Sequence, residues 1–211
     1  MNSILDVLNS SQGNDLIGGA SKQLGLSKAQ TASALESAMP LILAAMKNNS
    51  STSDGAAGLL GALGSSKHSG GMLDNLSSIL GGSNIDDDIL TDGGNILGHV
   101  FGGQQNNAAD TISKSSGIDM NSAMNLMKVA APFIMSYLGS KAKSSNVSDE
   151  NGLSAMLEGL LGHNGNAMQD MASKLQGFDN NDFSIDDIAG LLSDGSKGAE
   201  GIGGMLKGLF G

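Results

Sequence analysis

The stretch GGNILGHVFGG, residues 93–103, holds the residues of this chain that most resemble a working site. It contains His99, one of three histidines, between two glycine pairs. Histidine is suited to proton transfer near neutral pH, and glycine-rich loops can hold phosphate groups. A phosphate loop, however, follows a strand and needs a lysine in reach, whereas no strand pattern precedes this stretch and the next lysine is Lys114. We therefore expect a packed helix here.

The glycines of this stretch have the spacing of a helix that packs closely against another helix. Gly94, Gly98 and Gly102 recur every fourth residue and so fall on one helical face. Small residues at that interval let two helix backbones approach each other. Because each glycine costs a helix about 1 kcal/mol relative to alanine, we expect this helix to need a packing partner.

An acidic stretch, FDNNDFSIDD at residues 178–187, is the candidate for a calcium site. It offers oxygen ligands, but Phe183 stands where a calcium loop needs glycine for its sharp turn. The alternative is a helix start capped by Asp182 or Ser184, with acidic residues in its first turn. We favour the helix start and leave calcium open. The candidate ligands are Asp179, Asn181, Asp182, Asp186 and Asp187.

The other histidines give no sign of a site. His68 and His163 have no second histidine and no carboxylate at a ligand-like spacing. His99 aligns with Val7 and Gly208 in the repeats described below, and such exchange suits a packing position better than a catalytic one. We therefore expect a protein that is not an enzyme, with no catalytic, cofactor-binding or metal-binding residue and no cofactor.

Composition and charge narrow the classes of partner. The net charge is −10, from 21 acidic and 11 basic residues, and no cluster of basic residues stands out. Nucleic-acid binding depends on clustered lysine and arginine, so the charge argues against nucleic acid and against anionic membranes. There is no cysteine, no secretory leader pattern and no apolar run long enough for a membrane span. We expect a cytoplasmic protein.

The chain repeats itself. A shift of 92 positions superposes Ile4–Met46 on Ile96–Leu138 without a gap, and it brings together the only two prolines, Pro40 and Pro132. Such coincidences indicate an internal duplication, with a first unit at 1–92 and a second at 93–211.

A short apolar motif opens each unit and recurs near the end of the sequence. It lies near residues 4–11, 95–103 and 204–211, and we call these the first, second and third motif segments. The apolar spacing of all three segments, with the glycines of the second and third, predicts glycine-rich helices that lead each unit and pack against other helices.

Within each unit the apolar residues follow helical spacing. Helices are predicted to start at the N-caps Ser27 and Asp119 and to continue through the prolines, which should bend or restart them. Polar stretches at 47–57 and 139–151 are predicted to be loops. No strand alternation appears, so the expected fold is all-α. The expected buried positions are Ala32, Leu35, Met39, Ile42 and Met46, then Met124, Met127, Ala131, Ile134 and Leu138.

These patterns also resemble a known family. ASKQLGLSKAQTASALESAMPLILAAM, GNILGHVFGGQQNN and the repeated proline helix are similar to the YidB-like bacterial proteins, the domain of unknown function 937. The resemblance implies an all-helical bacterial protein with homeodomain-like helical units and no established activity. Relatives often have a calcium-loop-like stretch near the C-terminus, and the acidic stretch here departs from that pattern.

We expect an interaction or scaffold protein that associates with itself, as a homo-oligomer or head to tail, or with another protein. One alternative is a homeodomain-like module that binds nucleic acid, which would need Lys22, Lys28, Lys114 and Lys128 on one face. The other alternative is weak calcium binding by the acidic stretch.

Overall fold

The fold is built around two long helices, α3 (Lys28–Asn49) and α9 (Met120–Ser144), which begin at the predicted N-caps. The Ser27 side chain accepts a hydrogen bond from the Gln30 backbone, and the Gln30 side chain bonds back to Ser27, so both groups of a capping box are present. Asp119 caps α9 by accepting from the Ser122 N–H at 3.0 Å. Hydrogen bonds to Ser122 hold the pKa of this carboxyl below its usual value.

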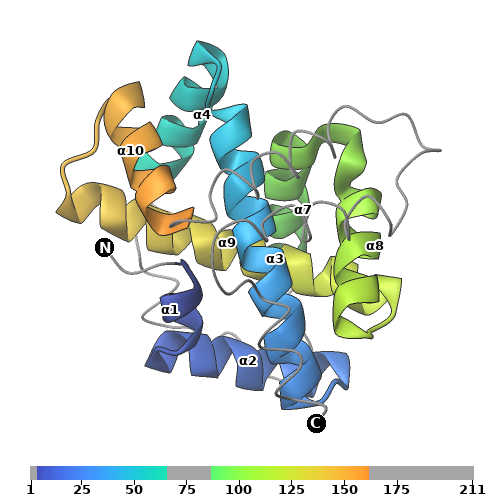
Figure 1. Cartoon of the computed structure of the whole chain (residues 1–211). Coiled ribbons are helices and arrows are strands. Elements are labelled where there is room, and N and C mark those ends of the chain that lie inside the picture. Colours follow the sequence, from blue (N-terminus) through green and yellow to red (C-terminus); the bar gives the residue numbers. More distant parts are fainter. Residues whose placement is uncertain (1–3, 66–86, 162–211) are drawn as a thin grey trace, which may run out of the picture. The chain divides into compact units, whose positions relative to one another are not determined.

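The computed structural model describes residues 4–65 and 87–161, and all of these lie within one compact unit (Figure 1). Every regular element among them is helical, which confirms the predicted all-α class. Besides α3 and α9, the elements are α1 (Ile4–Leu8), α2 (Ser11–Leu24), α4 (Ser53–Gly64), α7 (Asp87–Phe101), a 3₁₀ turn η2 (Gly102–Gln104), α8 (Gln105–Ser116) and α10 (Glu150–Leu161).

Both prolines lie inside continuous helices. Helix α3 runs through Pro40 and α9 runs through Pro132, so neither helix restarts there. Around the prolines every residue is buried, from 38 to 47 in α3 and from 129 to 136 in α9. A helix that is buried on all sides must be surrounded by other helices, and α3 and α9 pack against each other as they cross (Figure 1).

The remaining helices pack on this central pair in a reciprocal pattern. Helix α2 packs on α3, as α8 packs on α9. Helix α4 then crosses over to α9, whereas α10 crosses over to α3, and α4 and α10 contact each other. An ion pair between the buried Lys47 of α3 and the exposed Glu158 of α10 adds to one of these contacts.

Most of the predicted buried positions are buried, but the predicted loops are too long. Of the ten positions, only Ala32 and Met124 are partly exposed. Helix α3 continues to Asn49 and α4 begins at Ser53, while α9 continues to Ser144 and α10 begins at Glu150. The serines and asparagines of the predicted loops therefore lie partly in helix ends, where Ser50 and Ser144 donate to backbone carbonyls of the preceding turn. No described helix is long and apolar enough to cross a membrane.

The close approach between helices occurs at Gly93 of α7, not at the predicted glycine face. A methyl group on Gly93 would lie 2.8 Å from the Lys128 Cα of α9 and would overlap the Lys128 carbonyl. By contrast, Gly94 and Gly98 have room for a methyl group, and Gly102 is exposed with a positive φ of 58°. The prediction of a packing face at Gly94, Gly98 and Gly102 was therefore wrong.

The position of Gly93 follows from the proline in α9. Pro132 has no N–H, so it cannot donate the usual helical hydrogen bond to the carbonyl four residues earlier, which is that of Lys128. The Gly93 backbone packs against this same carbonyl. Only glycine permits such an approach, because any side chain would push α7 away from α9.

Substituting Gly93 and Gly94 separately tests this contact. We expect Gly93→Ala to lower the free energy of unfolding by about 1–3 kcal/mol, because the methyl group overpacks against backbone that cannot move aside. The adjacent Gly94→Ala, with its nearest neighbour Lys128 Cε at 3.8 Å, should be neutral or stabilising by up to about 1 kcal/mol. Urea unfolding followed by circular dichroism measures both, and equal effects would contradict the assigned close approach.

Candidate interaction site

The first motif segment forms α1, which docks with three apolar side chains. Ile4, Val7 and Leu8 are buried, and α1 packs mainly on α3 and α2. The spacing of these residues at i, i+3 and i+4 gives a single apolar stripe. Leu5 points away from that stripe and is 40% exposed, which is unusual for a leucine in this fold. The chain leaves α1 through a tight turn, in which the Ser10 hydroxyl donates to the Val7 carbonyl at 2.6 Å.

The second motif segment forms the C-terminal part of α7 and docks in the same manner. Its stripe is Leu97, Val100 and Phe101, all buried, and α7 packs mainly on α9 and also on α3. Helix α7 begins at Asp87, well before the start predicted for this segment, so it extends across the proposed boundary between residues 92 and 93.

The buried stripes of these two segments are offset by one position more than the sequence alignment used. The buried positions 4, 7 and 8 of α1 correspond to 97, 100 and 101 of α7, a shift of 93 positions instead of 92. His99 therefore corresponds to Asp6 and not to Val7, and both residues are exposed. At this offset His99 does not pair with Val7, and the repeat alignment itself stays a prediction.

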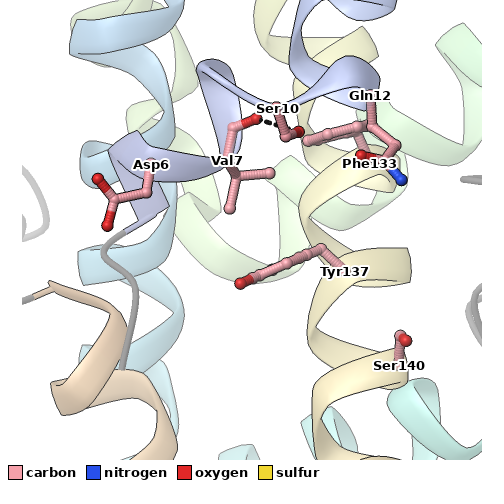
Figure 2. A pocket seen from close by; sticks show the side chains of 7 residues that line it. All are labelled: Asp6, Val7, Ser10, Gln12, Phe133, Tyr137 and Ser140. Atoms are coloured by element: carbon pink, nitrogen blue, oxygen red, sulfur yellow. Dashed lines mark hydrogen bonds between the residues drawn. The ribbon is translucent and has the colours of Figure 1, made fainter.

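A cavity of about 280 Å³ lies beside α1, between it and α9 (Figure 2). Val7 points toward the ring of Tyr137, the single tyrosine of the chain, and Asp6 lies on the side to which the hydroxyl of that ring points. Burial of the ring, and secondarily the charge of Asp6, raise the pKa of the Tyr137 phenol above its usual 10.0. The lining residues are Asp6, Val7, Ser10, Gln12, Phe133, Tyr137 and Ser140.

Ser10 at this cavity serves the local fold. Besides its bond to Val7, Ser10 is the N-cap of α2 and accepts from the Gly13 N–H at 3.2 Å. Gly13 itself packs so closely under the end of α1 that a side chain would overlap the Val7 and Leu8 carbonyls. The α1–α2 corner is thus a tight, glycine-dependent turn that holds one wall of the cavity in place.

A second cavity, of about 300 Å³, lies between α4 and the C-terminal end of α9. Its lining is mostly apolar, and Lys143 is its one charged residue. Two glycines, Gly64 and Gly139, contribute to the lining, so missing side chains help to create the space. Leu60, Leu63, Ala142 and Val147 complete it.

The residues singled out in the sequence for chemistry do not converge on either cavity. The His99 Nδ1 lies 2.9 Å from the Asn95 carbonyl of its own helix, and the Asn49 side chain donates to the His99 carbonyl at 3.1 Å. His68, His163 and the acidic stretch 178–187 lie outside the described residues. Within residues 4–65 and 87–161, no three acidic, histidine or cysteine side chains are grouped as metal ligands would be.

The lysines required by the nucleic-acid alternative differ in their surroundings. Lys22 and Lys28 are exposed, at the end of α2 and the start of α3. Lys114 pairs with Asp110 of its own helix at 2.6 Å, and Lys128 is half-buried against α7. Two of the four cations are therefore engaged within the fold, and this alternative stays an untested prediction.

Sequence reasoning did not find the cavity beside α1. Tyr137 follows the predicted stripe residue Ile134 by three positions in a long apolar helix, where its spacing is that of one more packing residue. Asp6 lies in a segment more than 120 positions away in sequence, and no pattern links the two residues. Only the docking of α1 beside α9 brings them together.

The ionisation of Tyr137 tests this placement. Asp6→Asn removes a negative charge that disfavours tyrosinate, so we expect the pKa of Tyr137 to fall while remaining above its usual value because of burial. Since the chain has no tryptophan, tyrosinate absorbance during alkaline titration reports this one group. The matched control Asp15→Asn, on α2, should leave the titration unchanged.

The same raised pKa has a consequence for stability. The neutral phenol is favoured in the folded chain. Its contribution to the free energy of unfolding is therefore present below the unfolded-state pKa and is lost as the pH rises through the folded-state pKa.

The titration of Asp6→Asn decides whether Asp6 acts on Tyr137. If the variant and the parent chain titrate identically, Asp6 lies away from Tyr137.

Comparison with known proteins identifies one family. No curated protein and no solved structure matches the chain. A family model, described as bacterial proteins of unknown function, DUF937, matches residues 6–142. This range is more than half of the chain and extends from within α1 nearly to the end of α9, so it includes both prolines, the second motif segment and most of the first. The chain therefore belongs to the bacterial DUF937 family.

Proposed function

We propose that this protein is a non-enzymatic interaction protein that associates with further copies of itself through its motif segments. The observation that carries the proposal is the docking of both described motif segments through the same i, i+3, i+4 stripe of buried side chains. A third segment with a related sequence occurs at 204–211, outside the described residues. A motif that docks on a long helix within the chain can dock on the same surface of a neighbouring chain.

The proposal includes the internal duplication, with units at 1–92 and 93–211. Several paired features support it. Helix α2 ends at Gly25 and α8 ends at Gly117, both left-handed with φ of 67° and 68°. Positions 55 and 152 are both glycines whose N–H bonds to the N-cap side chain of α4 or α10. The prolines occupy equivalent places in α3 and α9.

The reciprocal packing also supports a duplication. Helix α4 of the first unit lies on α9 of the second, and α10 of the second lies on α3 of the first. Two copies related by an approximate two-fold axis through the α3–α9 crossing would pack in this manner. The two units then share one core, and neither half buries its long helix alone.

A non-enzymatic role is supported by how the polar side chains near α1 are used. Ser10 caps a helix, and the other lining residues are the apolar or aromatic Val7, Phe133 and Tyr137 and the polar Asp6, Gln12 and Ser140, with no histidine or cysteine among them. Adaptable aliphatic and methionine packing suits a protein whose surfaces meet other helices. A cytoplasmic location is part of the proposal.

Light scattering coupled to size exclusion tests self-association. The full chain should have a mass above that of one chain and rising with concentration, whereas a chain ending at residue 200 should be a monomer. Phe210→Ala in the full chain should behave like the truncation, because it removes the largest apolar side chain of the third motif segment. Lys207→Gln, which keeps the apolar spacing, should still associate. If the full chain and the truncation are both monomers, the proposal fails.

A further inference from the structure

We propose that the third motif segment of one chain, taken with the two residues before it as 202–211, docks on a second copy in the groove that α1 occupies, by displacing α1. This inference rests on the proposed self-association and names the surface that receives the segment. The occupant is chosen by its sequence, and the groove is chosen by packing constraints at the sites where α1 and α7 dock.

The occupant has the required stripe of apolar residues. The second motif segment contains LGHVF at 97–101, and the third contains LKGLF at 206–210. Leu206, Leu209 and Phe210 therefore match the three side chains that α7 buries, at the same i, i+3 and i+4 spacing. They match the buried stripe of α1 equally, with larger residues at the second and third positions.

Packing at Gly93 excludes the site that α7 occupies. When residues 206–210 are placed on 97–101, residue 202 takes the place of Gly93. Residue 202 is isoleucine, and at that place even a methyl group would overlap the Lys128 carbonyl. Residues 202–211 therefore cannot dock as α7 does, because the Ile202 side chain would hold them away from α9.

The site that α1 occupies fits the segment better than α1 itself does. Lys207 would stand at the position of Leu5, which is 40% exposed. A lysine side chain is exposed to water at a lower cost in free energy than a leucine side chain. Leu209 would stand at the position of Val7, which borders the cavity of about 280 Å³ beside Phe133 and Tyr137. Its additional methylene would fill part of that cavity, and burial of each such group is worth about 0.8 kcal/mol.

Helix α1 is the helix most readily displaced. It has five residues, the fewest of any described α-helix, and an isolated helix of that length is not stable in water. It is held by the stripe of Ile4, Val7 and Leu8 and by the turn at Gly13. A segment with a larger apolar stripe can therefore compete for the same groove, and docking in trans would link one chain to the next.

Tyr137 provides a probe at the groove itself. It is the only tyrosine, there is no tryptophan, and residues 201–211 contain neither. The experiment titrates a peptide of residues 201–211 into a chain that ends at residue 200 and follows tyrosine fluorescence. We expect a saturable change, which the Phe210→Ala peptide should reduce by about tenfold or more in affinity, the cost of a lost large apolar anchor.

Variants of α1 test the competition. Ile4→Asp in the receptor weakens α1 docking and should tighten peptide binding by about tenfold, because the groove is then open in most molecules. Leu5→Ser, on the exposed side of α1, is the matched control and should leave the affinity unchanged. Circular dichroism checks the helix content, and if Ile4→Asp loses helix, Val7→Ala repeats the test with a smaller gain in affinity.

The outcomes separate the inference from the proposed function. Peptide binding that leaves Tyr137 fluorescence unchanged and is not tightened by the α1 variants would overturn the assigned groove while self-association stands. If the peptide does not bind although the full chain associates and the truncation does not, the assigned occupant is wrong. If the full chain and the truncation are both monomers and the peptide does not bind, both the assigned groove and the proposed self-association are wrong.

Discussion

Helices α3 and α9 pack against each other where each is buried on every side, and each of the other described α-helices contacts at least one of the two. This contact requires small and flexible side chains. Small side chains let helices approach closely, and flexible aliphatic ones fill the remaining space. The fully buried alanines of the two helices around the prolines are Ala38, Ala44, Ala45, Ala130 and Ala131. The chain has five phenylalanines, one tyrosine and no tryptophan. The packing of the core must therefore come from many contacts between aliphatic side chains.

The prolines act on this core through the hydrogen bond that each one removes. In α9 the consequence is visible, because the carbonyl four residues before Pro132 receives the backbone of α7 at Gly93. A proline in a buried helix is usually costly, and here the freed carbonyl lies at a close contact between two helices. The second motif segment, which follows Gly93, is thereby held in register along α9, and its apolar stripe is buried.

Sequence patterns predicted the helical class, the starts of both long helices and most of their buried positions. These features are local or strictly periodic: a capping serine or aspartate, and an apolar residue every three or four positions. The predicted glycine face was wrong because helical spacing identifies a possible face without identifying what lies opposite it. The need for glycine at position 93 comes from the carbonyl of Lys128, which is 35 positions later in the chain. No local sequence pattern contains that information.

The candidate site was even less accessible to sequence reasoning. The cavity beside α1 joins residues near the start of the chain to the second half of α9, and its volume depends on how a five-residue helix docks. Matching residues favour a shift of 92 positions between the motif segments, whereas their buried stripes are 93 positions apart, because burial depends on packing that residue identity does not record. Repeats nevertheless identified the segments whose docking forms the proposed interaction site.

Native-state hydrogen exchange of the full chain tests the central claim most directly, because it reports the stability of each helix separately. We expect amides at the α3–α9 crossing to be the slowest and to exchange together, and we expect α1 to exchange much faster than α7. Independent exchange of α3 and α9, or equal protection of α1 and α7, would contradict a shared core on which the first motif segment is the exchangeable element.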